Sequence, residues 1–388
     1  MGSKKYWNDL FPLDDLFSLW SLHSNDFRKR EIALKAKCRG DKDEYFKRHV
    51  SVGSTEELKK ELKRHALTEI HVGSVYTKDC HLVKSVTSNC VSVGRELVLD
   101  LDIQDKSVFC AVSKDDLPAC DAAMKTLLLS ANILRAALRE LFGFKLFLFS
   151  YSGRRGLHIS VLDKRAFDLT AEARSAIITR LTAPVFKHDP RLLFDVIATD
   201  PSFGKETKSA IDVAHHQLLK RRDQGGVGLL QLQRDRNKFL DILFDPSLLR
   251  KQFGVDLAAS TRRAAIGAAD GEACLAAITK RVSTSRFFSS RLKLILFSIV
   301  WPVLDAGASR DGHLLKSEFS INGNTDRIAV PFELRHEEPV WDARLCPTAA
   351  ALVAGDSDAV DAFEEGKRVL REVVERVKTE IAGKRKRD

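Results

Sequence analysis

The stretch ELVLDLDI, residues 96–103, combines the pattern of an apolar β-strand with two aspartates. Its leucines and Ile103 recur at every second position, so they share one face of the strand. Asp100 and Asp102 then share the opposite face, with Cα atoms about 6.6 Å apart. Two close carboxylates repel each other unless a cation lies between them, so the pair suits a divalent metal ion. Acids that only keep an exposed strand face soluble would give the same pattern.

The composition indicates a globular protein, and its basic charge favours a polyanionic partner, although many basic proteins bind no nucleic acid specifically. Hydrophobic residues make up 44% of the 388 residues, charged residues make up 30%, and the formal net charge is +10. The sequence has no apolar run of about 18 residues and no apolar signal segment at its N-terminus, so we expect an intracellular protein without a membrane span. The C-terminal GKRKRD predicts a nuclear location if it is a localisation signal, but it fits a solvated tail equally well.

The seven cysteines are scattered without a CxxC pair. This pattern fits reduced thiols better than a disulfide framework or a four-cysteine metal site. The sequence has no cluster of four cysteines that would indicate an iron-sulfur centre in this chain.

The periodicity of the chain predicts a mixture of helices and strands. Residues 1–65, including FRKREIALKAK, are expected to be mainly helical up to a strand in EYFKRHVSV. Strands are predicted in TEIHVGSVY and RELVLDLDI, followed by a helix in residues 117–143 that stops at Gly143. Two strands around a tight basic turn are predicted in KLFLFSYSGRRGLHISVLD, and Thr170 is expected to cap the helix that follows it.

The composition shifts between residues 200 and 290, where Ala-, Leu- and Arg-rich segments have helical spacing. We therefore expect a helical insertion subdomain at 200–290 within a discontinuous core of residues 1–199 and 291–388. A final helix is expected to carry an apolar stripe that docks on the protein's own core. The stripe consists of Phe363, Leu370, Val373, Val377 and Ile381.

The basic turn SYSGRRGLH, residues 150–158, is a candidate phosphate site. Its glycines allow a tight turn, and its two arginines offer guanidinium groups to phosphate oxygens. A solvated hairpin turn is the alternative interpretation. The residues concerned are Ser152, Gly153, Arg154, Arg155, Gly156 and His158.

A third candidate segment is WPVLDAGASRDGHLLKSEFS, residues 301–320. His313 and Lys316 lie three residues apart, so a helical turn or a bend would present both to one ligand. Asp305 by itself fits a turn or cap residue better than a metal ligand.

The order of these segments strongly resembles the small catalytic subunit of eukaryotic and archaeal DNA primase, from LFP near residue 11 to about residue 333. The resemblance implies a mixed α+β (α/β) catalytic core, the prim fold, with an inserted helical subdomain. It also implies that Asp100, Asp102 and Asp305 are the catalytic metal-binding aspartates. The nucleotide-binding residues that it implies are Glu31, Arg48, Ser152, Arg154, Arg155, Gly156, His158, His313 and Lys316.

The implied reaction is nucleotidyl transfer, in which the 3′-hydroxyl of one nucleotide attacks the α-phosphorus of the next. Two Mg²⁺ or Mn²⁺ ions about 3.5 to 4 Å apart would serve the attacking and leaving oxygens. The expected substrates are a single-stranded DNA template and nucleoside triphosphates. The resemblance further implies two protein partners, a large iron-sulfur-containing primase subunit and a replicative DNA polymerase.

The sequence departs from the family pattern at three places. The family commonly has a structural zinc site after the DxD strand, whereas Cys110 and Cys120 alone cannot close a tetrahedral site. We therefore expect no structural zinc unless distant ligands such as His81 join. Asn322 replaces a histidine that contacts nucleotide in the family, and His71 replaces an acid.

We therefore expect a DNA primase small subunit that makes short RNA primers on single-stranded DNA. One alternative is a primase-polymerase for repriming or damage bypass, which would share the metal and phosphate residues. The other is a non-catalytic scaffold that grips nucleic-acid phosphates, with its acids simply solvated.

Overall fold

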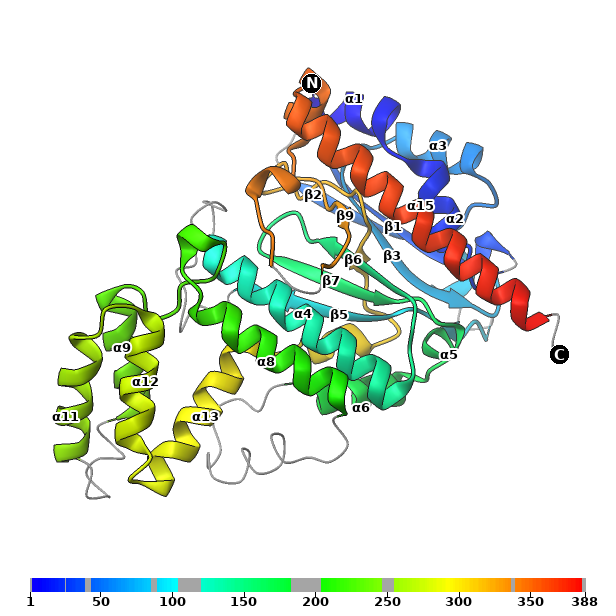
Figure 1. Cartoon of the computed structure of the whole chain (residues 1–388). Helices are drawn as coiled ribbons and strands as arrows, with labels where there is room; N and C mark the ends of the chain where they lie inside the picture. The colour runs from blue at the N-terminus through cyan, green and yellow to red at the C-terminus, as the bar shows by residue number, and fades with distance from the viewer. Residues whose placement is uncertain are drawn as a thin grey trace.

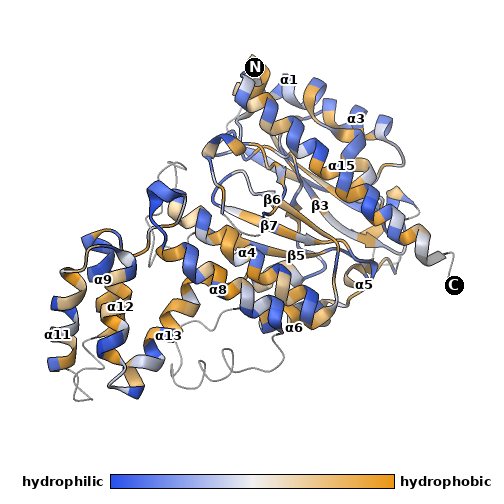
Figure 2. Cartoon of the chain, viewed as in Figure 1, coloured by the Kyte–Doolittle hydropathy of each residue, from blue (hydrophilic) through white to orange (hydrophobic). Residues whose placement is uncertain are grey.

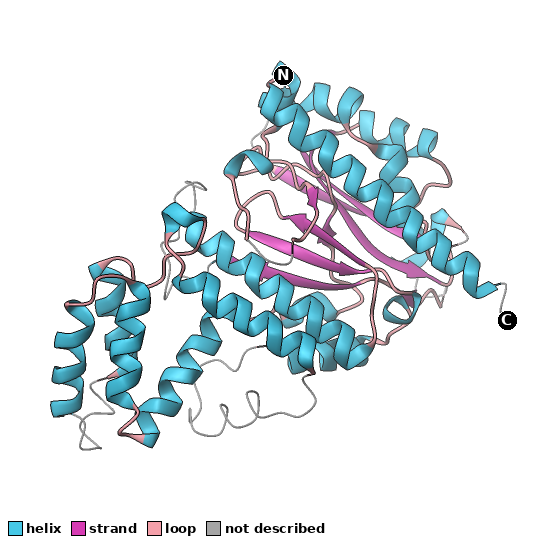
Figure 3. Ribbon diagram, in the orientation of Figure 1, coloured by secondary structure: helices cyan, strands magenta, loops and turns pink. Residues whose placement is uncertain are grey.

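The computed structural model describes residues 2–24, 26–38, 43–84, 89–103, 120–182, 204–245, 255–335 and 339–385. These residues form a mixed α+β fold in which helices surround two antiparallel sheets (Figures 1 and 3). The expected fold class is thereby confirmed. None of the helices in the described ranges is long and apolar enough to cross a membrane.

The first sheet has the strand order β2-β1-β3-β4, and the short strand β8 also pairs with β3. Its strands are β1 (Arg30–Lys37), β2 (Glu44–Val50), β3 (Ala66–Tyr76), β4 (Ser92–Gly94) and β8 (Leu315–Lys316). The helical expectation for residues 30–37 was wrong, because this segment is β1. Strand pairing with β2 on one side and β3 on the other outweighs its helix-forming composition.

The second sheet has the order β5-β7-β6-β9. Its strands are β5 (Leu97–Asp102), β6 (Phe147–Tyr151), β7 (Gly156–Val161) and β9 (Pro331–Phe332). The leucines of β5 are fully buried and join a core with helix α4 (Asp121–Phe142), as the alternating pattern predicts. Helix α4 ends at Gly143, whose φ of 66° is readily adopted by glycine.

Two short helices follow the β6–β7 hairpin, α5 (Lys164–Phe167) and α6 (Ala171–Leu181). The Thr170 side chain accepts a hydrogen bond from the Ala173 N–H at 3.2 Å and caps α6 as expected.

The segment between residues 204 and 300 is helical throughout its described elements. Its helices are α8 (Lys205–Leu219), α9 (Gln233–Leu243), α11 (Val255–Ile266), α12 (Gly271–Val282) and α13 (Arg286–Val300). Helix α8 packs along α4, and their apolar faces share one core (Figures 1 and 2). The last helix, α13, continues past residue 290, and the boundaries of the helical subdomain stay a prediction.

A second core joins the N-terminal and C-terminal helices to the first sheet. The helices are the π-helical turn η1 (Tyr6–Leu10), α2 (Leu13–Trp20), α3 (Thr55–Lys63), α14 (Ala349–Ala354) and α15 (Ser357–Arg385). Helix α1 (Gly2–Lys5) leads directly into η1. The stripe of α15 is buried in this core, with Ile381 partly buried at its edge (Figure 1). The prediction that this stripe docks on the protein's own core is confirmed.

Candidate active site

The aspartates of β5 lie against the neighbouring strand β7. Asp100 pairs in register with His158, and Asp102 pairs with Gly156. The Asp100 Oδ1 atom lies 3.7 Å from His158 Nε2, and Asp102 Oδ2 accepts a hydrogen bond from Arg155 Nη2 at 3.4 Å. The Asp100 side chain is 40% exposed and the Asp102 side chain is 48% exposed. They therefore face solvent together, beside cationic or protonatable groups.

The turn between β6 and β7 depends on its two glycines. Gly153 has a φ of 76°, and a Cβ on Gly156 would lie 2.2 Å from the Leu101 carbonyl oxygen. Ser152 Oγ accepts hydrogen bonds from the Gly156 N–H at 3.0 Å and the Arg154 N–H at 3.4 Å. Ser152 and Gly156 thus shape the turn that presents the arginines.

The arginines of this turn retain unused donors. The Nε atoms of Arg154 and Arg155 are both buried and have no hydrogen-bond partner within the described residues. A buried guanidinium donor without an acceptor is costly unless an anion supplies one. This observation favours the phosphate-binding interpretation of the turn over the solvated hairpin.

Lys316 enters the same site from the first sheet. On β8 it pairs with His71 of β3, and its Nζ lies 3.3 Å from Glu69 Oε1. Burial lowers the pKa of Lys316 and the Glu69 charge opposes this, while the nearby Arg154 charge lowers it further. Burial would raise the pKa of Glu69, but the hydrogen bond to His71 and the charge of Lys316 outweigh it and lower that pKa to about 2.

His158 lies near Asp100 and Lys316, and the charges of both influence its pKa. Burial lowers the pKa of His158, the Asp100 charge opposes the shift, and the Lys316 charge adds to it. The hairpin and Lys316 are therefore close enough to act on one anionic ligand, although about 160 residues separate them in the sequence.

Glu31 and Arg48 form an ion pair across β1 and β2, with Glu31 buried and the Arg48 side chain 34% exposed. Glu31 is fully buried and accepts hydrogen bonds from Arg48 Nε at 2.9 Å and from the Tyr76 hydroxyl at 3.1 Å. The hydrogen bond to Glu31 raises the pKa of Arg48. Arg48 also donates to the Gly312 carbonyl at 3.0 Å, so the pair ties the first sheet to the loop that carries His313.

Asp305 begins the short 3₁₀ turn η7 (Ala306–Ser309), where its Oδ1 accepts from the Gly307 N–H at 2.7 Å. This turn packs against β5. Burial lowers the pKa of His313, and the charges of both Asp305 and Asp100 oppose the shift. Asp305 is therefore a turn residue on the same side of the molecule as Asp100, and its role as third metal ligand stays a prediction.

The donor set fits Mg²⁺ or Mn²⁺. Asp100 and Asp102 provide hard oxygen donors, while no group of three or more His, Cys, Asp or Glu side chains in the described ranges could by itself hold a metal ion. Mg²⁺ is commonly bound by one or two carboxylates together with substrate phosphates and water rather than by an all-protein cage. Half-exposed carboxylates beside a phosphate-binding turn meet that requirement.

Two charged residues directly before β5 were not predicted as part of the site. The Glu96 carboxylate accepts two hydrogen bonds from Arg30, from Nη1 at 3.0 Å and from Nη2 at 2.7 Å. Arg95 Nη1 donates to the carbonyls of Arg310 and His313 at 2.6 and 2.7 Å. Arg95 fixes the loop that carries His313, while Glu96 holds the buried Arg30. The available signal was the charged pair directly before an apolar strand.

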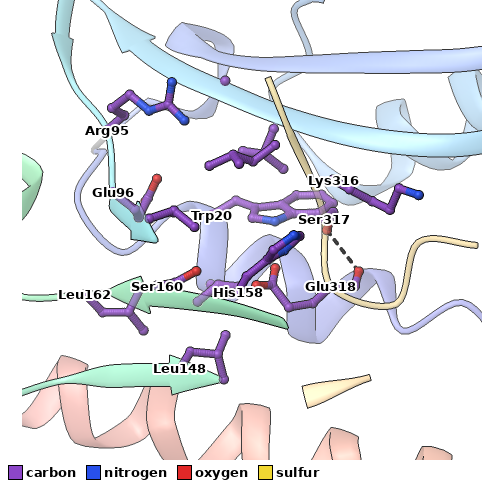
Figure 4. Close-up of a pocket in the computed structure, with 15 residues that line it drawn as sticks. Trp20, Arg95, Glu96, Leu148, His158, Ser160, Leu162, Lys316, Ser317 and Glu318 are labelled. Carbon is purple, nitrogen blue, oxygen red and sulfur yellow. Dashed lines mark hydrogen bonds between the residues drawn. The ribbon is translucent and has the colours of Figure 1, made fainter. Parts of the chain in front are cut away.

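A small cavity of about 50 Å³ lies between the sheets, and Lys316 and His158 are among the residues that line it (Figure 4). Trp20, Glu96 and Glu318 also line it. Burial, with a smaller contribution from the Glu96 charge, raises the pKa of Glu318 to about 7. Glu318 is thus a buried acid close to the candidate site, which the sequence patterns did not identify.

The other departures from the family pattern concern the structural zinc site and Asn322. Cys110 lies outside the described residues, so the expectation of no structural zinc stays a prediction. Cys120 is buried at the start of α4, and His81 lies in the 3₁₀ turn Cys80–Lys84. Asn322 is buried, and a Cβ added to Gly153 would lie 3.3 Å from the Asn322 Cβ. The loop that carries Asn322 therefore packs against the β6–β7 turn.

Comparison with known proteins agrees with this arrangement. The family model described as DNA primase small subunit matches residues 99–334, more than half of the chain. The DNA primase small subunit of Schizosaccharomyces pombe is 28% identical over 346 residues, which cover 85% of this chain and 72% of the relative. Those of Drosophila melanogaster and Caenorhabditis elegans are each 26% identical, covering 95% and 88% of this chain and 84% of each relative. The chain therefore belongs to the DNA primase small subunit family.

Proposed function

We propose that this chain is a catalytic primase subunit that joins ribonucleoside triphosphates into short RNA primers on single-stranded DNA. The observation that carries this proposal is the pairing of β5 with β7. It sets the half-exposed carboxylates of Asp100 and Asp102 beside a turn whose arginines have buried donors without acceptors. Anionic triphosphate and divalent metal are the ligands that this combination suits.

Asp100 and Asp102, together with Asp305, would hold two Mg²⁺ or Mn²⁺ ions. Bound there, such ions would supply Lewis-acid chemistry, lowering the pKa of the attacking hydroxyl and neutralising charge on the pyrophosphate that leaves. His158, 3.7 Å from Asp100 Oδ1, limits the positions open to that carboxylate.

The basic residues would bind and orient the triphosphate. Arg154 and Arg155 offer their unused guanidinium donors, and Lys316 adds a positive charge from the opposite sheet. Charges from both sheets would hold the α-phosphorus in place for in-line attack by the 3′-hydroxyl. Glu31 keeps Arg48 in a fixed position against the loop that carries His313.

The proposed partners follow from family membership. A small subunit implies a large one, which we propose carries the iron-sulfur cluster, and primers would pass to a replicative DNA polymerase. Such a protein would work inside the cell where DNA is replicated, which in a eukaryote is the nucleus.

The test is primer synthesis by the purified chain on single-stranded DNA with labelled nucleotides and Mn²⁺ or Mg²⁺. We expect Asp100→Asn or Asp102→Asn to lower synthesis by at least about 100-fold, because the amide keeps the shape but loses the metal-binding charge. Asp256→Asn, at an exposed position of α11, is the matched control.

Near wild-type synthesis by the Asp100→Asn variant at saturating metal, with native stability, would refute the metal assignment. A preference for deoxynucleotides would indicate a primase-polymerase instead. DNA binding without any product would indicate a scaffold.

A further inference from the structure

A second basic region lies away from the aspartates, at the end of the first sheet where β1 ends and β3 begins. It is a groove of about 460 Å³ between η1, α3 and the loop at residues 321–326. We call it the basic-aromatic groove and define it by Lys4, Trp7, Lys37, Tyr45, Lys63 and His65. Helices α1 and α3 lie beside each other at this end of the molecule (Figure 1).

The charge of the groove is largely uncompensated. Lys4, Lys37 and Lys63 are exposed, and none of them forms an ion pair within the ranges that the structure describes. Asp326 also lines the groove, but its carboxylate accepts a hydrogen bond from the Ala350 N–H at 3.0 Å at the start of α14. Three lysines around one groove therefore favour a ligand with several negative charges.

Tyr45 gives the groove an aromatic surface that is held in place. Tyr45 is 36% exposed, and its hydroxyl hydrogen-bonds to His65 Nδ1 at 2.6 Å. The other ring nitrogen of His65 lies 3.1 Å from Glu61 Oε1 on α3. An exposed, oriented aromatic ring beside lysines is the combination with which proteins stack the bases of a single strand.

Trp7 adds a second aromatic residue to the lining of the groove. It is 93% buried, so it forms part of the wall of the groove and leaves Tyr45 as the exposed ring.

The loop at residues 321–326 links the groove to the candidate active site by a hydrogen bond and an ion pair. Gly323 lines the groove and donates its N–H to Glu69 Oε1 at 3.2 Å, the same atom that lies 3.3 Å from Lys316 Nζ. Along β1, Lys37 is six residues from Glu31, or about 20 Å at 3.3 Å per residue. A strand that leaves the site would cover this distance with about six stacked nucleotides.

We propose that the basic-aromatic groove binds the single-stranded DNA template as it extends from the active site. This inference rests on the proposed function, because it supposes that a template is present at the aspartates. Lys37 and Lys63 would contact phosphates, and Tyr45 would stack on a base.

The experiment is a fluorescence anisotropy titration of the full chain with a labelled single-stranded DNA 20-mer, without nucleotide, at several salt concentrations. Each lost phosphate contact lowers the salt slope for single strands by about 0.7, which at 0.1 M salt corresponds to about a fivefold loss of affinity. The double variant Lys37→Ala/Lys63→Ala should therefore bind about 25-fold more weakly, with a slope lower by about 1.4. The matched control is Lys60→Ala/Lys280→Ala, which removes the same charge from exposed positions that do not line the groove.

Tyr45 distinguishes stacking from general electrostatic attraction. Tyr45→Ala should weaken DNA binding by about tenfold with an unchanged salt slope, whereas Tyr45→Phe keeps the ring and should retain most of the affinity. ATP binding, measured separately, should be unchanged in all of these variants, because the hairpin and Lys316 remain intact.

Two results would overturn the proposal. The first is a loss of DNA affinity in the Lys37/Lys63 variant no greater than that of the Lys60/Lys280 control. The second is a loss of ATP affinity equal to the loss of DNA affinity, which would mean that the groove takes free nucleotides. Since binding is measured without catalysis, a failure of the proposed function would appear separately, as absent primer synthesis by the wild-type chain.

Discussion

Glu318 is predicted to make the stability of the protein depend on pH. Its carboxyl is buried beside Trp20 and Glu96, and burial raises its pKa from the ordinary value of 4.5 to about 7. Between these values, the unfolded chain loses the proton while the folded chain keeps it. Stability therefore falls as the pH rises from about 4.5 to 7, and the full cost remains above that range.

The size of the effect follows from the two pKa values. A difference of about 2.5 at 1.36 kcal/mol per pKa unit corresponds to about 3 kcal/mol of lost stability above pH 7. Glu318→Gln removes the ionisation and keeps the shape. The variant should therefore gain about 2 to 3 kcal/mol relative to wild type between pH 5 and pH 8.

The assay is urea unfolding of wild type and Glu318→Gln at pH 5 and pH 8, followed by tryptophan fluorescence. Comparing the difference at the two pH values cancels the constant cost of burying an amide. Glu272→Gln, at an exposed position in the first turn of α12, should show no such change with pH. A stability difference between Glu318→Gln and wild type that is the same at both pH values would refute the reasoning.

Three further predictions concern the hairpin and zinc. Arg154→Ala, Arg155→Ala and Lys316→Ala should each weaken nucleoside triphosphate binding by about tenfold or more in calorimetric titrations and change single-stranded DNA affinity much less; equal losses for both ligands would instead indicate a general backbone-binding patch. Gly156→Ala should lower the thermal unfolding temperature and abolish nucleotide binding, because the new Cβ would lie 2.2 Å from the Leu101 carbonyl oxygen. The control Gly383→Ala should be tolerated, because no atom lies within 4 Å of its new Cβ. Elemental analysis of protein purified without chelator should find less than one zinc per chain, and Cys110→Ser and Cys120→Ser should cost little beyond lost packing; one tightly held zinc per chain would contradict the assignment.

The local patterns of the sequence were sufficient for the elements that carry the candidate site. Strand β5, helix α4 with its stop at Gly143, the β6–β7 hairpin and the apolar stripe of α15 were all predicted correctly. Each of these elements is predicted by the periodicity of its own apolar side chains or by a turn residue a few positions away. The periodicity also predicts which face of the element is buried. The order of the motifs was also sufficient to indicate the family.

Tertiary structure alone decided which of these elements meet. Residues 30–37 have a helix-forming composition, yet they become β1 because two distant strands supply hydrogen bonds on both of its sides. Strand pairing also places Lys316 opposite His71 and buries Glu318, and helix and loop packing assembles the basic-aromatic groove from the N-terminus, α3 and residues 321–326. Such contacts join residues up to about 300 positions apart. Their energies depend on burial and on charges that no local pattern contains, so only the folded chain reveals them.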